Sequence, residues 1–287
     1  MVPQKTLDTF LCIHHRDVDY LLETVLQSYR ANFLPKHRLY MITNNPQHLK
    51  DFLARIGMAQ DVIVSADQDW LSKKELELPG WYRQQLIKLR AYEFCETENF
   101  CNLGADTVLL QPIAYDDLVD GDFPVLYYTH HMLPDQHARY ERQRLGYVGK
   151  ILQVEPTNAL RYVDFINDLF TFNREALQEL NEYLKSLYGP EPYVQLLSAL
   201  DDRLVNRNRF GEWSLYSVYL LDVLKRRVTL RNTKPDFLYQ VHSKFSFYFY
   251  RFNTKVVHFV SKDLDVDRIK NQIVHHYPEL QERLKQL

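Results

Sequence analysis

LDTFLCI, at residues 7–13, is a short run of β-forming residues that ends in the polar cluster HHRD at residues 14–17. Asp17 is a suitable N-cap for a helix. Apolar residues follow it at the i, i+3, i+4, i+7 spacing of one buried helix face, at Val18, Leu21, Leu22, Val25, Leu26 and Tyr29. The stretch therefore predicts a strand followed at once by an amphipathic helix.

The same order repeats further along the chain. RLYMIT at residues 38–43 predicts a second strand, which ends in the turn signal Asn44-Asn45-Pro46. A helix over residues 47–56 and a third strand over 61–65 follow. This β-α-β-α-β order predicts a parallel sheet covered by helices. Ligands bind such sheets at the carboxyl ends of the strands, so residues 14–17 and Asn44-Asn45 are candidate binding segments.

The pattern becomes α+β beyond residue 115. We expect strands over 123–129 and 165–172, and helices over 139–152 and 212–225, with a helical tail from residue 267. Asn173 caps a further helix that Gly189-Pro190 ends. No repeat or low-complexity linker is visible. The sequence thus predicts an α/β protein with a mostly parallel sheet, a mixed α+β C-terminal half and a helical tail, all within one domain over 1–287.

Composition excludes several classes of protein. The 287 residues are 46% hydrophobic and 25% charged, as in soluble globular proteins, and the net charge of −2 draws the chain to neither nucleic acid nor anionic lipid. No stretch is long and apolar enough to span a bilayer, and the N-terminus does not resemble a signal peptide. The three cysteines lack metal-site spacing. We expect a cytoplasmic location and, at most, peripheral membrane association.

Glycine is scarce, and its positions exclude the common phosphate-binding loops. The eight glycines are less than half of the usual share of about 7%. No two are separated by a single residue, which excludes G-x-G-x-x-G. The only Gly-Lys pair, at Gly149, has Arg144 where a Walker A loop needs glycine. The H-E-x-x-H and G-x-S-x-G motifs are also absent.

Two segments carry candidate binding residues. In the helix predicted over 80–95, one face carries Trp81, Gln85, Lys88 and Tyr92. This face is either plain surface or the wall of a cleft. In the second case, Gln85 and Lys88 donate hydrogen bonds to phosphate or sugar oxygens. Asp106 lies where one short apolar run ends and another begins, as a turn former or a metal ligand.

These segments resemble a known family. GWYRQQLIKL at 80–89, LGADTVLLQPI at 103–113 and FGEWSLY at 210–216 are similar to motifs of the bacterial DUF6492 family, regarded as GT-A-type glycosyltransferases of the nucleotide-diphospho-sugar transferase superfamily. The family's motifs are G-W-x-x-Q-Q-x-x-K-L, D-x-D-T/V-x-F-x-x-P and F-S-E-x-x-x-Y. The resemblance extends over roughly residues 7–260.

The resemblance implies a nucleotide-sugar donor, bound by residues 1–113, and a glycan or lipid-linked acceptor, bound by 114–262, with C-terminal helices over 263–287. The D-x-D motif implies Mn²⁺ or Mg²⁺ on the donor's diphosphate. Asp106 matches its last acid, as catalytic residue and metal ligand, and Ala105 its middle position. Gln85 and Lys88 match the family's helix, where they face the nucleotide-sugar.

Gly104 departs from the family, because it stands where the motif has its first aspartate. Three outcomes are open: weaker metal binding, metal-independent transfer with Lys88 or an arginine neutralising the diphosphate, or loss of catalysis.

The resemblance implies a possible functional role for further residues, beside the structural role that each could have. Glu212 is either a helix cap or the general base that takes the acceptor's proton. His258 is either a core residue or a third metal ligand. His14, Arg16 and Asn44 are expected at the nucleobase and ribose. The acceptor-side candidates are His130, His131 and Tyr216.

The sequence is consistent with three functions. The first is a glycosyltransferase that uses a divalent metal through the degenerate motif at residues 104–106. The second is a degenerate domain that binds nucleotide-sugar or glycan without turnover. The third is a metal phosphoesterase that uses Asp106 with His130 and His131.

Overall fold

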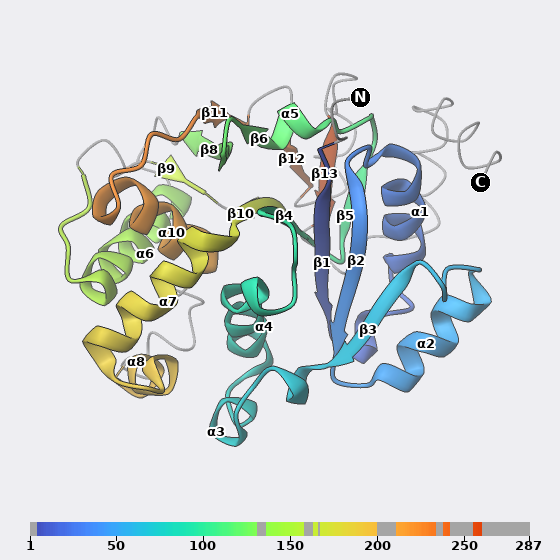
Figure 1. Ribbon diagram of the computed structural model, residues 1–287, viewed down its shortest axis with the longest axis horizontal. Coiled ribbons are helices and arrows are strands. Elements are labelled where there is room, and N and C mark those ends of the chain that lie inside the picture. The colour runs from blue at the N-terminus through green and yellow to red at the C-terminus, as the bar shows by residue number, and fades with distance from the viewer. Residues whose placement is uncertain are drawn as a thin grey trace.

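The computed structural model describes residues 5–130, 136–157, 163–165, 167–199, 211–233, 238–241 and 255–259. At its centre is a five-stranded sheet with the order β10-β4-β1-β2-β3 (Figure 1). The strands are β1 (Leu7–Ile13), β2 (Lys36–Thr43), β3 (Val62–Ala66), β4 (Asn99–Leu103) and β10 (Leu169–Asn173). Strands β1 to β4 run parallel, and β10 is antiparallel to β4. The predicted α/β class with a mostly parallel sheet is confirmed.

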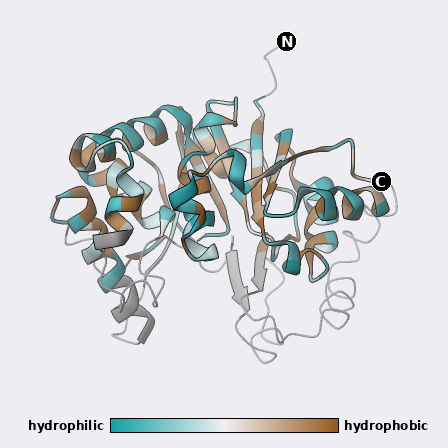
Figure 2. Ribbon diagram, turned by 90° about the horizontal axis from the view of Figure 1, so that it is seen from below, coloured by the Kyte–Doolittle hydropathy of each residue, from teal (hydrophilic) through white to brown (hydrophobic). Residues whose placement is uncertain are grey.

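Helices cover both faces of this sheet. Leu7, Leu11 and Ile13 of β1 pack toward α1 (Leu22–Asn32) and α2 (Pro46–Arg55). The alternate residues Phe10 and Cys12 pack on the other face. There they join α4 (Gly80–Leu89), α6 (Gln136–Leu152), α7 (Arg174–Tyr188) and α10 (Glu212–Val218). The covering helices carry both hydrophobic and hydrophilic residues, as amphipathic helices do (Figure 2). Burial on both faces explains why the seven residues of β1 are apolar except for Asp8 and Thr9.

Shorter elements complete the described part of the chain. The small sheets are β11-β8-β9 (Leu230–Asn232, Leu126–His130, Val163–Asp164), β12-β13-β5 (Leu238–Val241, Val256–Phe259, Thr107–Leu109) and β6-β7 (Val119–Asp120, Phe123–Pro124). The remaining α-helices are α3 (Lys73–Leu76), α5 (Tyr115–Leu118) and α8 (Pro192–Ala199). Short 3-10 turns lie at His15–Asp17, Asp67–Asp69 and Ala91–Glu93.

Several predicted boundaries are confirmed. The Asn173 side chain accepts a hydrogen bond from Ala176 N and so caps α7, and the helix ends just before Gly189, whose φ is 83°. A left-handed φ of this kind favours glycine. The helix expected over 212–225 is present as α10, and it continues as a π-helical turn over Tyr219–Val223.

Other boundaries were predicted wrongly. Asp17 does not cap α1, because a 3-10 turn capped by His14 intervenes and α1 begins only at Leu22. Helix α4 ends at Leu89 and a 3-10 turn replaces the expected continuation to residue 95. The strand expected over 165–172 is β10, which begins at Leu169. The predicted helical tail lies outside the described residues.

Within the described ranges, no helix combines the length and the apolar character that crossing a membrane requires.

The three cysteines give a test of the packing. Cys12, Cys95 and Cys101 are buried and reduced. Burial raises the pKa of Cys12 and of Cys101 to about 12, and that of Cys95 further still. A raised pKa keeps the thiol protonated until the pH approaches it, so at pH 8 the thiolate of Cys12 is about one part in ten thousand. We expect almost no reaction of the native protein with a disulfide reagent at pH 8, and reaction of all three thiols in guanidinium. Rapid labelling of the native protein would contradict this packing.

Candidate functional site

Two joined cavities lie where β1, β2 and β4 end. The β1–β2 cavity is lined by Cys12, Ile13, His14, Asp17, Ile42, Thr43, Asn44, Asp67, Gly80, Trp81, Arg83, Gln84 and Ile87. The β1–β4 cavity is lined by Cys12, Ile13, His14, Asp17, Tyr20, Trp81, Gln84, Lys88, Asn102, Leu103, Gly104, Ala105, Asp106, Arg144, Asp168 and Trp213. Their volumes are about 300 and 360 Å³, and the six residues common to both join them. This is the predicted edge of the sheet, and it brings together His14, Asn44 and Asp106.

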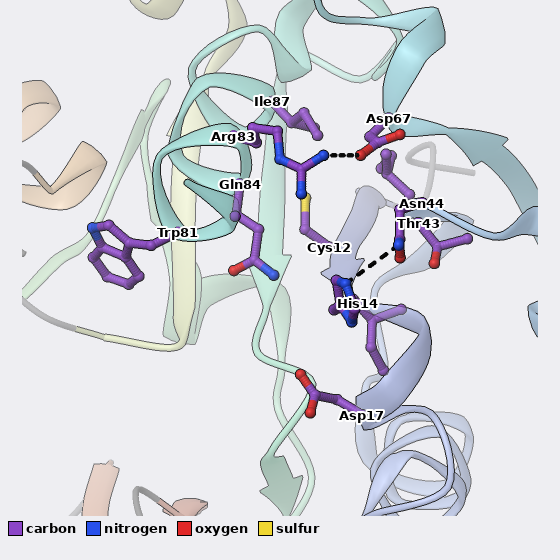
Figure 3. A pocket seen from close by; sticks show the side chains of 13 residues that line it. Cys12, His14, Asp17, Thr43, Asn44, Asp67, Trp81, Arg83, Gln84 and Ile87 are labelled. Carbon is purple, nitrogen blue, oxygen red and sulfur yellow. Dashed lines mark hydrogen bonds and ion pairs between the residues drawn. The ribbon is translucent and has the colours of Figure 1, made fainter. Parts of the chain in front are cut away.

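The β1–β2 cavity is lined by polar groups from four segments, which are the ends of β1, β2 and β3 and the helix α4 (Figure 3). Arg83 of α4 and Asp67, after β3, point toward each other with 3.2 Å between Nη1 and Oδ2. Asn44, after β2, lies 3.3 Å from the His14 ring through its Nδ2, and its Oδ1 accepts a hydrogen bond from His15 N. Burial lowers the pKa of His14, and the neighbouring His15 lowers it further. The imidazole is therefore neutral at pH 7 and suits hydrogen bonding to an uncharged polar group.

A buried ion pair borders the β1–β4 cavity. Lys88 Nζ donates to Glu212 Oε1 at 2.7 Å and lies 4.9 Å from the centre of the Trp213 ring. Lys88 lines the cavity, whereas the Glu212 side chain is fully buried behind it. Gln85 Oε1 accepts a hydrogen bond from Glu212 N and fixes the first residue of α10 against α4. The arrangement presents one ammonium group to the cavity.

The charge of this ammonium is stabilised locally. Burial acts to lower the pKa of Lys88, but Glu212 and, more weakly, Asp168 outweigh it, so the pKa lies above its usual value. For Glu212, burial raises the pKa of the carboxyl, and the Lys88 ammonium acts in the opposite direction. Lys88 therefore carries a full positive charge at neutral pH, next to the carboxylates of the cavity.

The face of α4 that lines the cavity differs from the predicted face by one residue, with Gln84 in the place expected for Gln85. Trp81, Gln84 and Lys88, spaced i, i+3, i+7, line the β1–β4 cavity. Gln85 lies beside this face, is fully buried and contacts α10. The placement of Gln85 at the nucleotide-sugar is therefore corrected, because its side chain is fully buried, lines neither cavity and accepts a hydrogen bond from Glu212 N.

Other predicted residues lie elsewhere. Arg16 is exposed and lines neither cavity. Tyr216 is a core residue, not an acceptor-side residue, because its hydroxyl accepts a hydrogen bond from Asn173 N at 2.7 Å and its ring packs on Phe172. The Glu212 carboxylate faces Lys88, whereas a general base must face the acceptor. Ala105 lines the β1–β4 cavity.

Of the candidate histidines His130, His131 and His258, the structure describes the backbone of two. His130 ends β8. The backbone of His258 in β13 pairs with Thr107, the residue after Asp106, so the chain brings these two segments together. His131 lies outside the described residues.

Several lining residues were not predicted: Asp67, Arg83, Gln84, Asn102, Arg144, Asp168 and Trp213. Asn102 carried a sequence signal, since it is a polar residue within the otherwise largely apolar strand β4. The others come from separate parts of the chain, and only the folded structure brings them together.

Gly104 packs against Asp168, the residue before the neighbouring strand β10. A Cβ at position 104 would lie 2.8 Å from Asp168 Cβ and 2.6 Å from Thr107 Oγ1. Its φ is not in the left-handed region, so close contact, and not backbone conformation, favours glycine here.

Gly104→Ala is therefore expected to lower the free energy of unfolding by about 1–3 kcal/mol, the usual effect of overpacking. Gly146→Ala is the matched control, because Gly146 lies in α6 with open space around a Cβ and alanine favours helix. Chemical unfolding of both variants measures the difference. Equal stability of Gly104→Ala and wild type would contradict the contact.

Among the described residues, no three His, Cys, Asp or Glu side chains cluster closely enough to hold a metal ion by themselves. A cation at Asp106 would therefore need oxygen ligands from the substrate as well.

The comparisons define the family and the fold. A model of the family of unknown function DUF6492 matches residues 5–247, and the chain belongs to this family. None of the curated proteins matches the sequence.

Solved structures with a similar fold include two glycosyltransferases. The WbbM bifunctional glycosyltransferase in its apo form aligns with 99% of this chain and 52% of its own, at 11% identity and a TM-score of 0.57. The galactosyltransferase LgtC, in complex with donor and acceptor sugar analogues, aligns with 94% of this chain and 96% of its own, at 12% identity and a TM-score of 0.51. The chain thus spans about half of WbbM and nearly all of LgtC. At these identities the likeness shows a GT-A glycosyltransferase fold.

Proposed function

We propose that this protein is a glycosyltransferase that binds a nucleotide-sugar in the two joined cavities and moves the sugar to a glycan or lipid-linked acceptor. The observation that carries the proposal is the Lys88 ammonium, held by buried Glu212 at the wall of a cavity that also contains Asp106. A diphosphate needs such a fixed positive charge, and this chain has no glycine-rich loop to supply one. The glycosyltransferase fold supports the same conclusion.

The two cavities suit the two parts of a donor. The β1–β2 cavity offers an amide, an imidazole and the Arg83–Asp67 pair, which are groups that bind a nucleobase and ribose by hydrogen bonds. The β1–β4 cavity offers the charge for the diphosphate. We assign His14 and Asn44 to the nucleoside and Lys88 to the diphosphate.

During transfer, the bond between the anomeric carbon and the diphosphate oxygen breaks. A bond to the acceptor hydroxyl oxygen forms, and that hydroxyl gives its proton to an oxygen of the leaving diphosphate. Negative charge grows on the leaving diphosphate, where Lys88 stabilises it with no reorganisation, because Glu212 already holds the ammonium in place. We therefore assign Glu212 to positioning Lys88. His130, at the end of β8, remains our acceptor-side candidate.

The residues of the β1–β4 cavity fit a divalent cation. Mn²⁺ and Mg²⁺ prefer carboxylate and phosphate oxygens, and Asp106 would hold such an ion together with the donor's diphosphate. When bound, the cation supplies positive charge that stabilises the leaving nucleoside diphosphate.

Release of nucleoside diphosphate from a panel of nucleotide-sugars, with Mn²⁺ or Mg²⁺ and with glycan acceptors, tests the proposal. We expect release from one class of donor by wild type and none by Lys88→Met. Absence of both binding and release for every donor would refute the proposal. The crowded glycine at position 104 favours a second candidate, a non-catalytic binder, and saturable donor binding without any release would select it.

A further inference from the structure

We propose that Asp168, which directly precedes β10, supplies the carboxylate that position 104 lacks, so that Asp168 and Asp106, which lies in the turn between β4 and β5, together hold a divalent cation that arrives with the donor diphosphate. The inference rests on the proposed function, because the diphosphate completes the site. It differs from the D-x-D arrangement, in which both acids come from one loop.

The sheet places the two positions opposite each other. In the antiparallel ladder between β10 and β4, Leu169 pairs with Leu103 and Phe170 with Asn102. The next step brings Asp168 opposite Gly104, whose N donates to Asp168 O at 2.6 Å. Residues directly opposite in a ladder share a face of the sheet. Phe170, two residues along, packs on the α4 side, so Asp168 lies on the side where Lys88 lies.

The space at Gly104 is already filled by Asp168. A Cβ at position 104 would lie 2.8 Å from Asp168 Cβ and 3.2 Å from Asp106 Oδ1. Asp168 and Asp106 therefore border the same point, the one that a side chain at position 104 would occupy. A side chain at 104 and the present position of Asp168 exclude each other, so the glycine leaves room for the aspartate that precedes β10.

Asn102 independently indicates a polar ligand at this place. It lines the β1–β4 cavity and is only 1% exposed. Neither its Nδ2 nor its Oδ1 has a hydrogen-bond partner in the part of the chain that the structure describes. A buried polar group left unpaired costs about 1–3 kcal/mol, so the amide is better explained by a ligand that donates to it and accepts from it.

The charges fit a cation bound between carboxylate and phosphate. The β1–β4 cavity holds the carboxylates of Asp17, Asp106 and Asp168 against the cations Lys88 and Arg144. A diphosphate adds negative charge to this set, and a divalent ion between it and two carboxylates restores the balance. The competing role for Asp168, an electrostatic partner of Lys88 alone, requires no metal, so Mn²⁺ dependence separates the two roles.

The test measures Mn²⁺ binding by the electron paramagnetic resonance signal of the free ion, with and without nucleoside diphosphates (UDP, GDP, ADP, CDP and dTDP). We expect wild type to take up Mn²⁺ only when one of these nucleotides is present. Asp168→Asn and Asp106→Asn should each weaken this uptake by at least about tenfold. Asp51→Asn is the control, because it removes the same charge from the exposed face of α2, where the Asp51 carboxylate accepts a hydrogen bond from Gln47.

A swapped variant tests the same point by gain of function. Asp168→Gly removes one of the two atoms that collide with a side chain at 104, and the other, Thr107 Oγ1, is the end of a side chain that can turn. The double variant Gly104→Asp/Asp168→Gly therefore moves the carboxylate back to the end of β4. We expect it to recover Mn²⁺ uptake relative to Asp168→Gly, whereas Gly104→Asp alone should not improve on wild type, because its Cβ meets Asp168. Recovery also shows that the single variant lost a ligand and not its fold.

Three results would overturn the inference. In the first, Asp168→Asn takes up Mn²⁺ as well as wild type while Asp106→Asn does not. Asp168 is then not a metal ligand, and the proposed donor binding still stands. In the second, Asp168→Asn weakens nucleotide affinity equally with and without Mn²⁺. Asp168 then acts only as an electrostatic partner of Lys88. If wild type binds none of the nucleotides in calorimetry under either condition, the proposed function fails together with the inference.

Discussion

Replacement of Lys88 by methionine is expected to weaken nucleoside diphosphate binding by about 10- to 100-fold, since a hydrogen bond to a charged group contributes about 1.5–3 kcal/mol. The same change leaves the Glu212 carboxylate buried without its cation. We therefore also expect a loss of about 3–5 kcal/mol in the free energy of unfolding, as for other broken buried ion pairs. Calorimetry and urea unfolding measure the two effects.

Two variants separate these effects. Lys88→Met/Glu212→Gln removes the unpaired charge, so it should recover part of the stability but none of the binding. Lys74→Met is the matched control, because Lys74 forms an exposed ion pair with Glu191 and should change stability by less than about 1 kcal/mol. Full nucleotide affinity in Lys88→Met would mean that the ion pair serves only the fold.

The second large effect concerns the opposite end of β1. Asp8 is fully buried and accepts hydrogen bonds from Arg38 N, Glu96 N and Thr97 N, and it contacts His37 Nδ1 at 2.7 Å. In Asp8→Asn, either orientation of the new amide turns its NH₂ group toward backbone N–H donors. We expect a loss of about 3–5 kcal/mol in the free energy of unfolding, the range for breaking a buried charged network.

Asp51→Asn again provides the control, with an expected change of less than about 0.5 kcal/mol for an exposed position. Urea unfolding of both variants at pH 7 is the measurement. A loss of less than 1 kcal/mol in Asp8→Asn would show that β1 is fixed by packing alone.

The parallel sheet was predictable because its signal is local. Strands β1, β2 and β3 are short apolar runs, each followed by polar or turn residues, and the helices between them carry one apolar stripe. Their order in the chain is enough to predict a covered sheet and to locate its binding edge at His14 and Asn44. The start of α1 was less predictable, since the 3-10 turn over His15–Asp17 competes with the helix for the same residues.

The site was only partly predictable because its contacts join distant segments. Lys88 and Glu212 are 124 residues apart, and no local pattern indicates that they form an ion pair. On α4, a helix face shows which residues lie together but not which neighbour they meet, so the buried Gln85 could not be told from Gln84 at the cavity. The sequence did show that Gly104 stands where the family motif has its first aspartate. That Asp168 fills its place follows only from the register of an antiparallel strand.

The most direct test of donor binding in these cavities is calorimetric titration of nucleotide-sugars into wild type and Asp106→Asn, each with and without Mn²⁺. Asparagine keeps the shape of the side chain and removes its charge, so the fold should be unchanged. We predict that one donor binds wild type at least about tenfold more tightly with Mn²⁺ and that Asp106→Asn loses this gain. Equal donor affinity in all four titrations would contradict a metal-assisted site at Asp106, and absence of binding by any donor would contradict the account as a whole.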